Sequence, residues 1–137
     1  MKGEYKIREV KTRVNQDVFR DIVLANYDSK CAITGIDIPA LLKASHIIPW
    51  SKNEKERLNP ENGICFSALY DCAYDRGYIG INKRFEIVLS QDLKKKSKEI
   101  YYSKYFADLE GVTIKKPKKY LPKQDFLEYH LDTIFKK

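Results

Sequence analysis

A histidine, an asparagine and two aspartates in the middle of the chain could together hydrolyse a phosphodiester bond. His46 is followed after sixteen residues by Asn62. Asp71 comes nine residues after Asn62, and Asp75 lies four residues beyond it. An imidazole can take a proton from water because its pKa lies near the operating pH. Carboxylates at positions i and i+4 share one helix face and can point at one cation. The ordered set predicts metal-assisted hydrolysis with His46 as the general base.

The oxygen ligands of this set predict a hard divalent cation. Mg²⁺ is the first candidate, because it binds one or two carboxylates, keeps several waters and takes further ligands from substrate phosphates. Mn²⁺ is the second candidate. Such an ion neutralises charge on the scissile phosphate and stabilises the leaving oxygen. The side-chain amide of Asn62 is expected to fix the loop that carries the histidine, so that the base faces the phosphate.

Each of these residues also has an explanation that involves no catalysis. A single histidine at a strand end is more often structural than catalytic, and an Asn-Gly pair is usually a turn. An aspartate pair at i and i+4 is usually a solvated helix face. The combination of strand histidine, loop asparagine and helix aspartate, in that order, favours the catalytic interpretation.

The positive charge of the chain is concentrated in its second part. The net charge is +7, and residues 83–137 carry 14 Lys/Arg against 8 Asp/Glu. This asymmetry predicts a polyanionic partner, nucleic acid first and an anionic membrane second, although a lysine-rich surface can also serve solubility alone. The candidate phosphate contacts are Lys43, Arg76, Lys94, Lys95, Lys96, Lys115, Lys116, Lys118 and Lys119.

Several classes of protein are excluded by the composition. No apolar run approaches the roughly 20 residues that a membrane span needs, so no membrane-spanning segment is expected and DNA is preferred to a membrane as the partner. The charged N-terminus lacks the apolar core of a signal peptide. The three cysteines form no CxxC pair, and their odd number argues against a closed disulfide framework. A cytoplasmic protein is expected.

The hydrophobic pattern predicts mixed helices and strands. A helix is expected over 14–28, with Asn15 as its N-cap, and a short helix over 67–77, capped by Ser67 and ended by Gly77. The remaining expected elements are two short strands or a hairpin over 31–50, an exposed loop over 51–63, a hairpin over 78–90 with Asn82-Lys83 near its turn, a strand over 111–114 and a closing helix over 125–135 that docks on the core.

Four segments resemble the HNH endonucleases, in the branch found in restriction enzymes. These segments are CAITG, SHIIPW, NPENGICFSALYD and YDRGYIGI, and similar flanking parts extend the resemblance over 13–135. The resemblance implies an α+β fold: a ββα-metal core, with the histidine on the hairpin and the third motif position on the helix, and flanking N- and C-terminal helices. It further implies that His46 is the general base, Asn62 the middle motif residue and Asp71 a metal ligand, with Asp75 as a second ligand.

The chain departs from the family pattern at two places. Many HNH members have a metal-binding Asp or His just before the base, where this chain has Ser45, whose hydroxyl is a weak candidate for a metal or substrate contact. Many members also carry two CxxC knuckles for structural zinc, which this chain lacks. Structural zinc is therefore not expected, and Cys31, Cys65 and Cys72 are expected to pack as small apolar side chains.

The expected function is metal-dependent hydrolysis of DNA, in restriction or defence against foreign DNA. A single nuclease domain is expected over 1–137, with its core motif at about 31–80 and a basic elaboration over 83–137. Three alternatives stay open: a DNA-binding module with a decayed nuclease centre, an RNA-directed nuclease, and an interaction protein whose basic tail binds an acidic partner. An enzyme that cuts both strands would most simply act as a homodimer.

Overall fold

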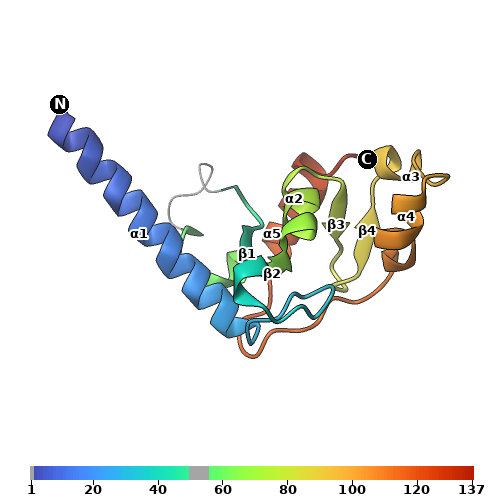
Figure 1. Cartoon of the computed structure of the whole chain (residues 1–137), viewed down its shortest axis with the longest axis horizontal. Coiled ribbons are helices and arrows are strands. Elements are labelled where there is room, and N and C mark those ends of the chain that lie inside the picture. Colours follow the sequence, from blue (N-terminus) through green and yellow to red (C-terminus); the bar gives the residue numbers. More distant parts are fainter. Residues whose placement is uncertain (1, 50–55) are drawn as a thin grey trace.

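The computed structural model describes residues 2–49 and 56–137 of the chain. It has the expected α+β architecture of helices and small antiparallel sheets (Figure 1). No helix within those two ranges is long and apolar enough to span a membrane. The helices and strands are α1 (Lys2–Asn26), β1 (Leu42–His46), β2 (Gly63–Ser67), α2 (Ala68–Asp75), β3 (Ile79–Ile81), β4 (Ile87–Leu89), α3 (Gln91–Lys94), α4 (Ile100–Tyr105) and α5 (Gln124–Thr133).

The centre of the molecule is a two-stranded hairpin followed directly by a helix. Strands β1 and β2 pair antiparallel, with Leu42 opposite Ser67 at one end and His46 opposite Gly63 at the other. Helix α2 begins at the residue after β2 and packs against both strands. This is the ββα arrangement that the family resemblance implies, and it places the histidine on the hairpin and Asp71 on the helix.

The prediction of two strands within 31–50 is wrong. Of the described residues 31–49, only Leu42–His46 form a strand, and their partner β2 begins at Gly63. Residues 32–34 form a turn instead, and Pro39 opens a short 3-10 helix, Pro39–Leu41, because its fixed φ suits a helix start. All five residues of β2 are buried, which is why they form a core strand.

Helix α1 begins at Lys2, so the prediction that Asn15 caps it is wrong. The preceding residues are rich in Lys, Glu and Arg, which are good helix formers and let the helix continue toward the N-terminus. At its other end α1 is fixed to the hairpin. The guanidinium of Arg20 donates hydrogen bonds to the carbonyl oxygens of Leu42 (2.6 Å) and Pro39 (2.8 Å). Figure 1 shows this end of α1 against β1 and β2, and the other end extending away.

A glycine in β2 allows α1 to approach the hairpin closely. A Cβ added to Gly63 would lie 2.4 Å from Cγ2 of Val23 and 2.8 Å from Cζ of Phe19. Real Cβ contacts are never so short, so any other residue would push α1 outward. Phe19 and Val23 are both fully buried there, and they join α1 to the core of the hairpin.

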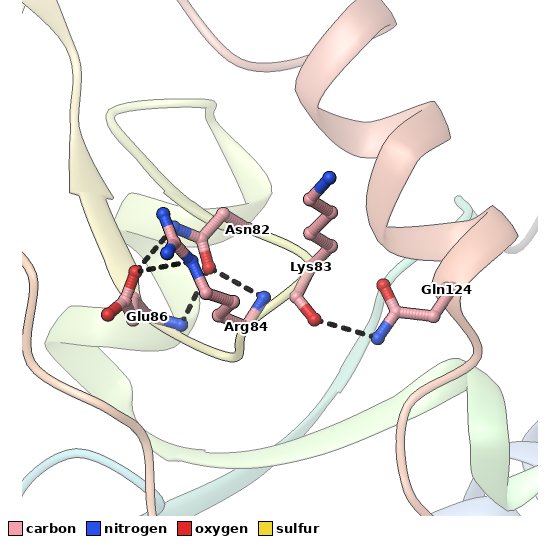
Figure 2. Close-up of polar contacts among 5 residues, drawn as sticks. All are labelled: Asn82, Lys83, Arg84, Glu86 and Gln124. Carbon is pink, nitrogen blue, oxygen red and sulfur yellow. Dashed lines mark hydrogen bonds and ion pairs between the residues drawn. The ribbon is translucent and has the colours of Figure 1, made fainter.

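The predicted hairpin over 78–90 is confirmed, as is the position of its turn. Strands β3 and β4 pair antiparallel, and the Asn82 amide organises the turn between them (Figure 2). Its oxygen accepts hydrogen bonds from the backbone N–H groups of Arg84 (2.9 Å) and Glu86 (3.0 Å). The amide nitrogen of Gln124, at the start of α5, donates to the carbonyl of Lys83 at 2.9 Å, which ties α5 to this turn.

The strand predicted over 111–114 is reduced to one isolated bridge between Thr113 and Glu86. Two further backbone hydrogen bonds join this segment to Ile87 of β4. The Gly111 N–H donates to the Ile87 carbonyl (2.8 Å), and the Ile87 N–H donates to the Val112 carbonyl (2.9 Å). Gly111 has a φ of +80°, a left-handed conformation that turns the chain and shortens the pairing.

The closing helix docks on the core as predicted, against the C-terminal end of α2. Gly77 follows α2 with a φ of +79°, and its bare Cα lets α5 approach, because a Cβ there would lie 2.1 Å from the carbonyl oxygen of Ile134. His130 of α5 is buried, stacks on the ring of Tyr74 with centroids 3.8 Å apart, and donates from Nε2 to the Tyr74 carbonyl at 2.8 Å. His130 thus satisfies a carbonyl in the last turn of α2.

The buried His130 should make the fold sensitive to acid. Burial lowers the pKa of this imidazole to about 4, outweighing the Tyr74 hydrogen bond and the charge of Asp75. The unfolded chain has the ordinary pKa near 6.5, so it binds more protons between these values. The free energy of unfolding should therefore fall by about 3 kcal/mol as the pH drops from 6.5 to 4. Denaturant titrations at several pH values measure this, and in His130→Gln the drop over this interval should be smaller by that amount. An identical pH dependence in both proteins would contradict the assignment.

Candidate active site

The ring of His46 is held from two sides at the end of β1. Its imidazole stacks on the ring of Phe19 from α1, with centroids 3.8 Å apart and planes inclined by 9°. Its Nε2 lies 3.4 Å from the carbonyl oxygen of Arg57. Since a carbonyl can only accept, Nε2 carries the proton and Nδ1 has the lone pair that a general base needs.

The surroundings of His46 favour its neutral form. Burial lowers the pKa of the imidazole below its ordinary 6.5, against the smaller opposing effects of the Arg57 carbonyl and the negative charge of Asp75. A histidine with a lowered pKa is unprotonated at neutral pH. It can therefore accept a proton there, as a general base must.

Asn62 lies beneath the loop that follows the histidine. Its side chain is buried, and its amide makes two hydrogen bonds with the backbone of Ile48. The amide oxygen accepts from Ile48 N–H at 2.8 Å, and the amide nitrogen donates to the Ile48 carbonyl at 3.3 Å. The Asn62 carbonyl also accepts from Ile47 N–H at 2.9 Å. These bonds extend the β1–β2 pairing past His46 and hold the chain on its C-terminal side.

Ser45 and Asp71 contact each other directly between β1 and α2. The Ser45 hydroxyl donates a hydrogen bond to the Asp71 carboxylate. Ser45 is buried, opposite Ile64 in the hairpin, whereas Asp71 is half-buried in the first turn of α2. A carboxylate near a helix N-terminus is stabilised by the helix dipole. Asp75 is exposed one turn later, and its charge acts on His46.

The oxygen donors on α2 fit a cation that needs few protein ligands. Among the side chains that the structure describes, those of residues 13–49 and 56–137, no three of His, Cys, Asp or Glu come close enough together to enclose a metal ion. Structural zinc takes four such ligands, whereas Mg²⁺ is commonly bound by one or two carboxylates plus water and substrate phosphate. Asp71, held by Ser45, can supply such a carboxylate, with Asp75 as a further donor on the same helix.

Two of the three cysteines pack as predicted, and one does not. Cys31 and Cys65 are fully buried, whereas Cys72 is exposed, because it lies on the face of α2 turned away from the core. Burial would raise the pKa of the Cys31 thiol, but hydrogen bonds from Thr34 and Ser67 outweigh that effect and lower it. Ser67 is the N-cap residue of α2 as predicted, but its side chain makes no capping hydrogen bond, because its hydroxyl accepts from the Cys31 thiol instead.

The candidate phosphate contacts are spread over three places. Lys43 and Arg76 are exposed on the ββα unit, on β1 and just after α2. The first lysine cluster, residues 94–96, lies at α3, toward the end of the molecule opposite α1 (Figure 1). The second lysine cluster, the lysines of residues 115–119, lies against the C-terminal end of α1, where Lys118 N–H donates to the Asn26 carbonyl at 2.8 Å.

Some of these lysines already have acidic partners on the surface. Lys118 pairs with Asp28 at 2.6 Å and Lys94 with Glu110 at 3.2 Å. Lys95 pairs with Asp92 at 3.7 Å. Pairs this exposed contribute little stability and are screened by salt, so a phosphate can compete for the same lysines.

Two residues that contact His46 could not be identified from the sequence. Phe19 lies in the helix predicted over 14–28, and Arg57 lies in the exposed loop predicted over 51–63. Helical spacing does indicate that Phe19 points into the protein. No local pattern indicates that its ring meets an imidazole 27 residues away, or that the Arg57 carbonyl lies beside Nε2.

Residues 31–82 match the sequence profile of the HNH endonuclease family, and no curated protein matches the chain significantly. Among solved structures, the chain is similar to a protein described as a modification-dependent TagI restriction endonuclease, with a TM-score of 0.59 over 85% of this chain and 14% sequence identity. The chain spans 37% of that protein's length, and the likeness shows a shared fold. Residues 31–82 are therefore similar in sequence to the nuclease domain of the HNH endonuclease family.

Proposed function

We propose that this chain is a metal-dependent DNA endonuclease that acts in the cytoplasm, in restriction or defence against foreign DNA. The observation that carries the proposal is the position of His46, whose ring is held against Phe19 and the Arg57 carbonyl at the end of β1, beside the aspartate-bearing helix α2. The basic residues of 83–137 support DNA as the substrate, because Lys and Arg neutralise the phosphates of a duplex.

In this proposal each polar residue of the centre has a separate task. His46 accepts a proton from the attacking water at Nδ1, while the Arg57 carbonyl keeps the proton of the ring on Nε2. Asn62 holds the backbone after the histidine, and Ser45 holds the carboxylate of Asp71. A divalent cation bound by Asp71, and by Asp75 as second ligand, would supply charge neutralisation at the scissile phosphate, with Mg²⁺ preferred over Mn²⁺.

Digestion of matched DNA and RNA substrates tests the substrate class. The protein is incubated with Mg²⁺ and equal amounts of labelled duplex DNA, single-stranded DNA and RNA of one sequence composition. Duplex DNA should be cut fastest, because the proposal assigns the lysines to duplex phosphates. Faster cutting of RNA would favour an RNA-directed nuclease. Binding of DNA without cutting in Mg²⁺ or Mn²⁺ would identify a binding module with a decayed centre.

The lysine clusters should govern how DNA affinity depends on salt. Neutralising Z phosphates gives a slope of about −0.9Z in a plot of log K against log salt. Changing the four lysines of the second cluster to glutamine should flatten that slope by up to about 3.6, and should weaken binding to all sequences alike. Fluorescence anisotropy titrations at several salt concentrations measure this.

A matched control changes an equal charge elsewhere, at the exposed Lys104, Lys123, Lys136 and Lys137, and should leave the slope nearly unchanged. If the slope is also unchanged after both lysine clusters are neutralised, these lysines only confer solubility. The contacts with DNA phosphates would then have to be made around Lys43 and Arg76 on the ββα unit.

A further inference from the structure

We infer that Phe19 of α1 is a positioning residue for His46, whose ring it holds in the orientation needed for proton transfer. The inference rests on the proposed nuclease function, and it assigns a catalytic contribution to a helix outside the matched residues 31–82. Phe19 does not touch the substrate in this account. It acts through the imidazole.

The contact between the two rings has the geometry of a true stack. The centroids are 3.8 Å apart and the planes are within 9° of parallel, so the faces of both rings are in van der Waals contact. Such a contact fixes the plane of the imidazole. The Arg57 carbonyl at 3.4 Å from Nε2 then fixes the rotation of the ring within that plane. The two contacts come from different segments, and together they fix the direction in which Nδ1 points.

The phenyl ring is itself held in place by the hairpin. Phe19 is 1% exposed, and its Cζ would lie 2.8 Å from a Cβ on Gly63. Gly63 is the residue directly opposite His46 in the β1–β2 register. The missing side chain at Gly63 therefore provides the space that the phenyl ring occupies as it reaches the histidine. The glycine opposite the base and the aromatic residue on α1 therefore depend on each other, because the ring fills the space that the glycine leaves.

This packing has a chemical consequence as well as a geometric one. A buried, apolar neighbour disfavours the charged imidazolium, in agreement with the lowered pKa of His46. Fixing a base in its reactive orientation also removes a conformational search from the chemical step, and small misplacements of catalytic groups reduce rates strongly. Loss of the stack should therefore slow the chemistry and leave DNA binding unchanged.

Proton NMR of the two histidines tests the stack without reference to activity. The chain has only two histidines, and His130 stacks on Tyr74 with the same 3.8 Å separation. Both sets of imidazole signals should be shifted upfield by ring currents in the wild-type protein, with nuclear Overhauser contacts between the Phe19 and His46 rings. In Phe19→Leu the His46 signals should move downfield, while those of His130 stay in place and serve as an internal control.

Single-turnover cleavage then tests the functional part. Phe19→Leu should lower the cleavage rate on the order of 10-fold, less than the full loss of a general base, with an unchanged Kd for DNA. Val23→Ala is the matched control, because Val23 packs on the same Gly63 from the same helix. It should lower the melting temperature comparably, yet keep the wild-type rate below its melting transition and the wild-type His46 signals.

Several results would overturn the inference. Wild-type spectra without contacts between the two rings would do so even if Phe19→Leu failed to fold. A wild-type rate in Phe19→Leu would do so as well, and so would an equal loss of rate in Val23→Ala. None of these results bears on the proposed function, which depends on whether His46 itself is required. Conversely, unimpaired cleavage by a His46 variant would remove the proposed function but leave the ring contacts observable.

Discussion

Replacing His46 with alanine is expected to lower the single-turnover rate of DNA cleavage by about 10²–10⁴-fold, the usual effect of losing a general base. The substitution removes Nδ1, the proton acceptor, while the hairpin, the Asn62 bonds to Ile48 and the lysines remain. DNA affinity should therefore stay near the wild-type value. The rate is measured with protein in excess over labelled duplex, and affinity by anisotropy under the same conditions in Ca²⁺.

The second histidine provides the matched control for this experiment. His130→Gln also removes an imidazole, but one that is buried under α5 and bonded to the Tyr74 carbonyl. It should lower stability and keep the cleavage rate within a few-fold of wild type at 25 °C. A His46→Ala protein that cleaves as fast as His130→Gln would show that the base lies elsewhere.

The second large effect is expected at Asp71. Asp71→Asn keeps the shape of the side chain but removes the charge that would hold the cation, and metal stabilisation of the transition state amounts to several kcal/mol. The cleavage rate should fall by about 10²-fold or more at a fixed Mg²⁺ concentration. Asp71 should matter more than Asp75, because Asp71 is half-buried and held by Ser45, whereas Asp75 is exposed.

Asp75→Asn is the internal comparison for the same experiment. It should raise the Mg²⁺ concentration needed for the half-maximal rate and cause a smaller loss of the maximal rate. Rates are measured over a range of Mg²⁺ concentrations for both variants and for Ser45→Ala, which removes the hydrogen bond to Asp71. Wild-type Mg²⁺ dependence in both aspartate variants would place the cation at other residues.

The parts of the fold that were predictable from sequence are those specified by neighbouring residues. The 78–90 hairpin is defined by alternation around Asn82, whose amide makes bonds within its own turn. The end of α2 is defined by Gly77, which adopts a positive φ. The hydrophobic pattern alone did not predict the pairing of β1 with β2, because the two strands are far apart in the sequence and the extended character of Gly63–Ser67 comes from its burial.

The candidate site also combines features that the local sequence specifies with features that depend on the tertiary fold. The order of His46, Asn62 and Asp71 makes these residues the candidates, because each type and its spacing carries a recognisable chemistry. Their contacts depend on the tertiary fold: the Asn62 amide meets the Ile48 backbone only when the chain folds back after the loop. Gly63 belongs to an Asn-Gly pair, usually a turn, but here it is a strand residue that makes room for α1.

Relaxation of supercoiled plasmid tests the central claim most directly. Wild-type protein and His46→Ala are incubated side by side with plasmid in Mg²⁺, in Mn²⁺ and in excess chelator, with binding checked in each arm. The proposed mechanism predicts nicked or linear product from the wild-type protein with either cation, none with chelator, and at least 10²-fold slower product formation by His46→Ala. Equal cutting by both proteins, cutting that persists in chelator, or a wild-type protein that binds the plasmid and never cuts it would contradict the mechanism.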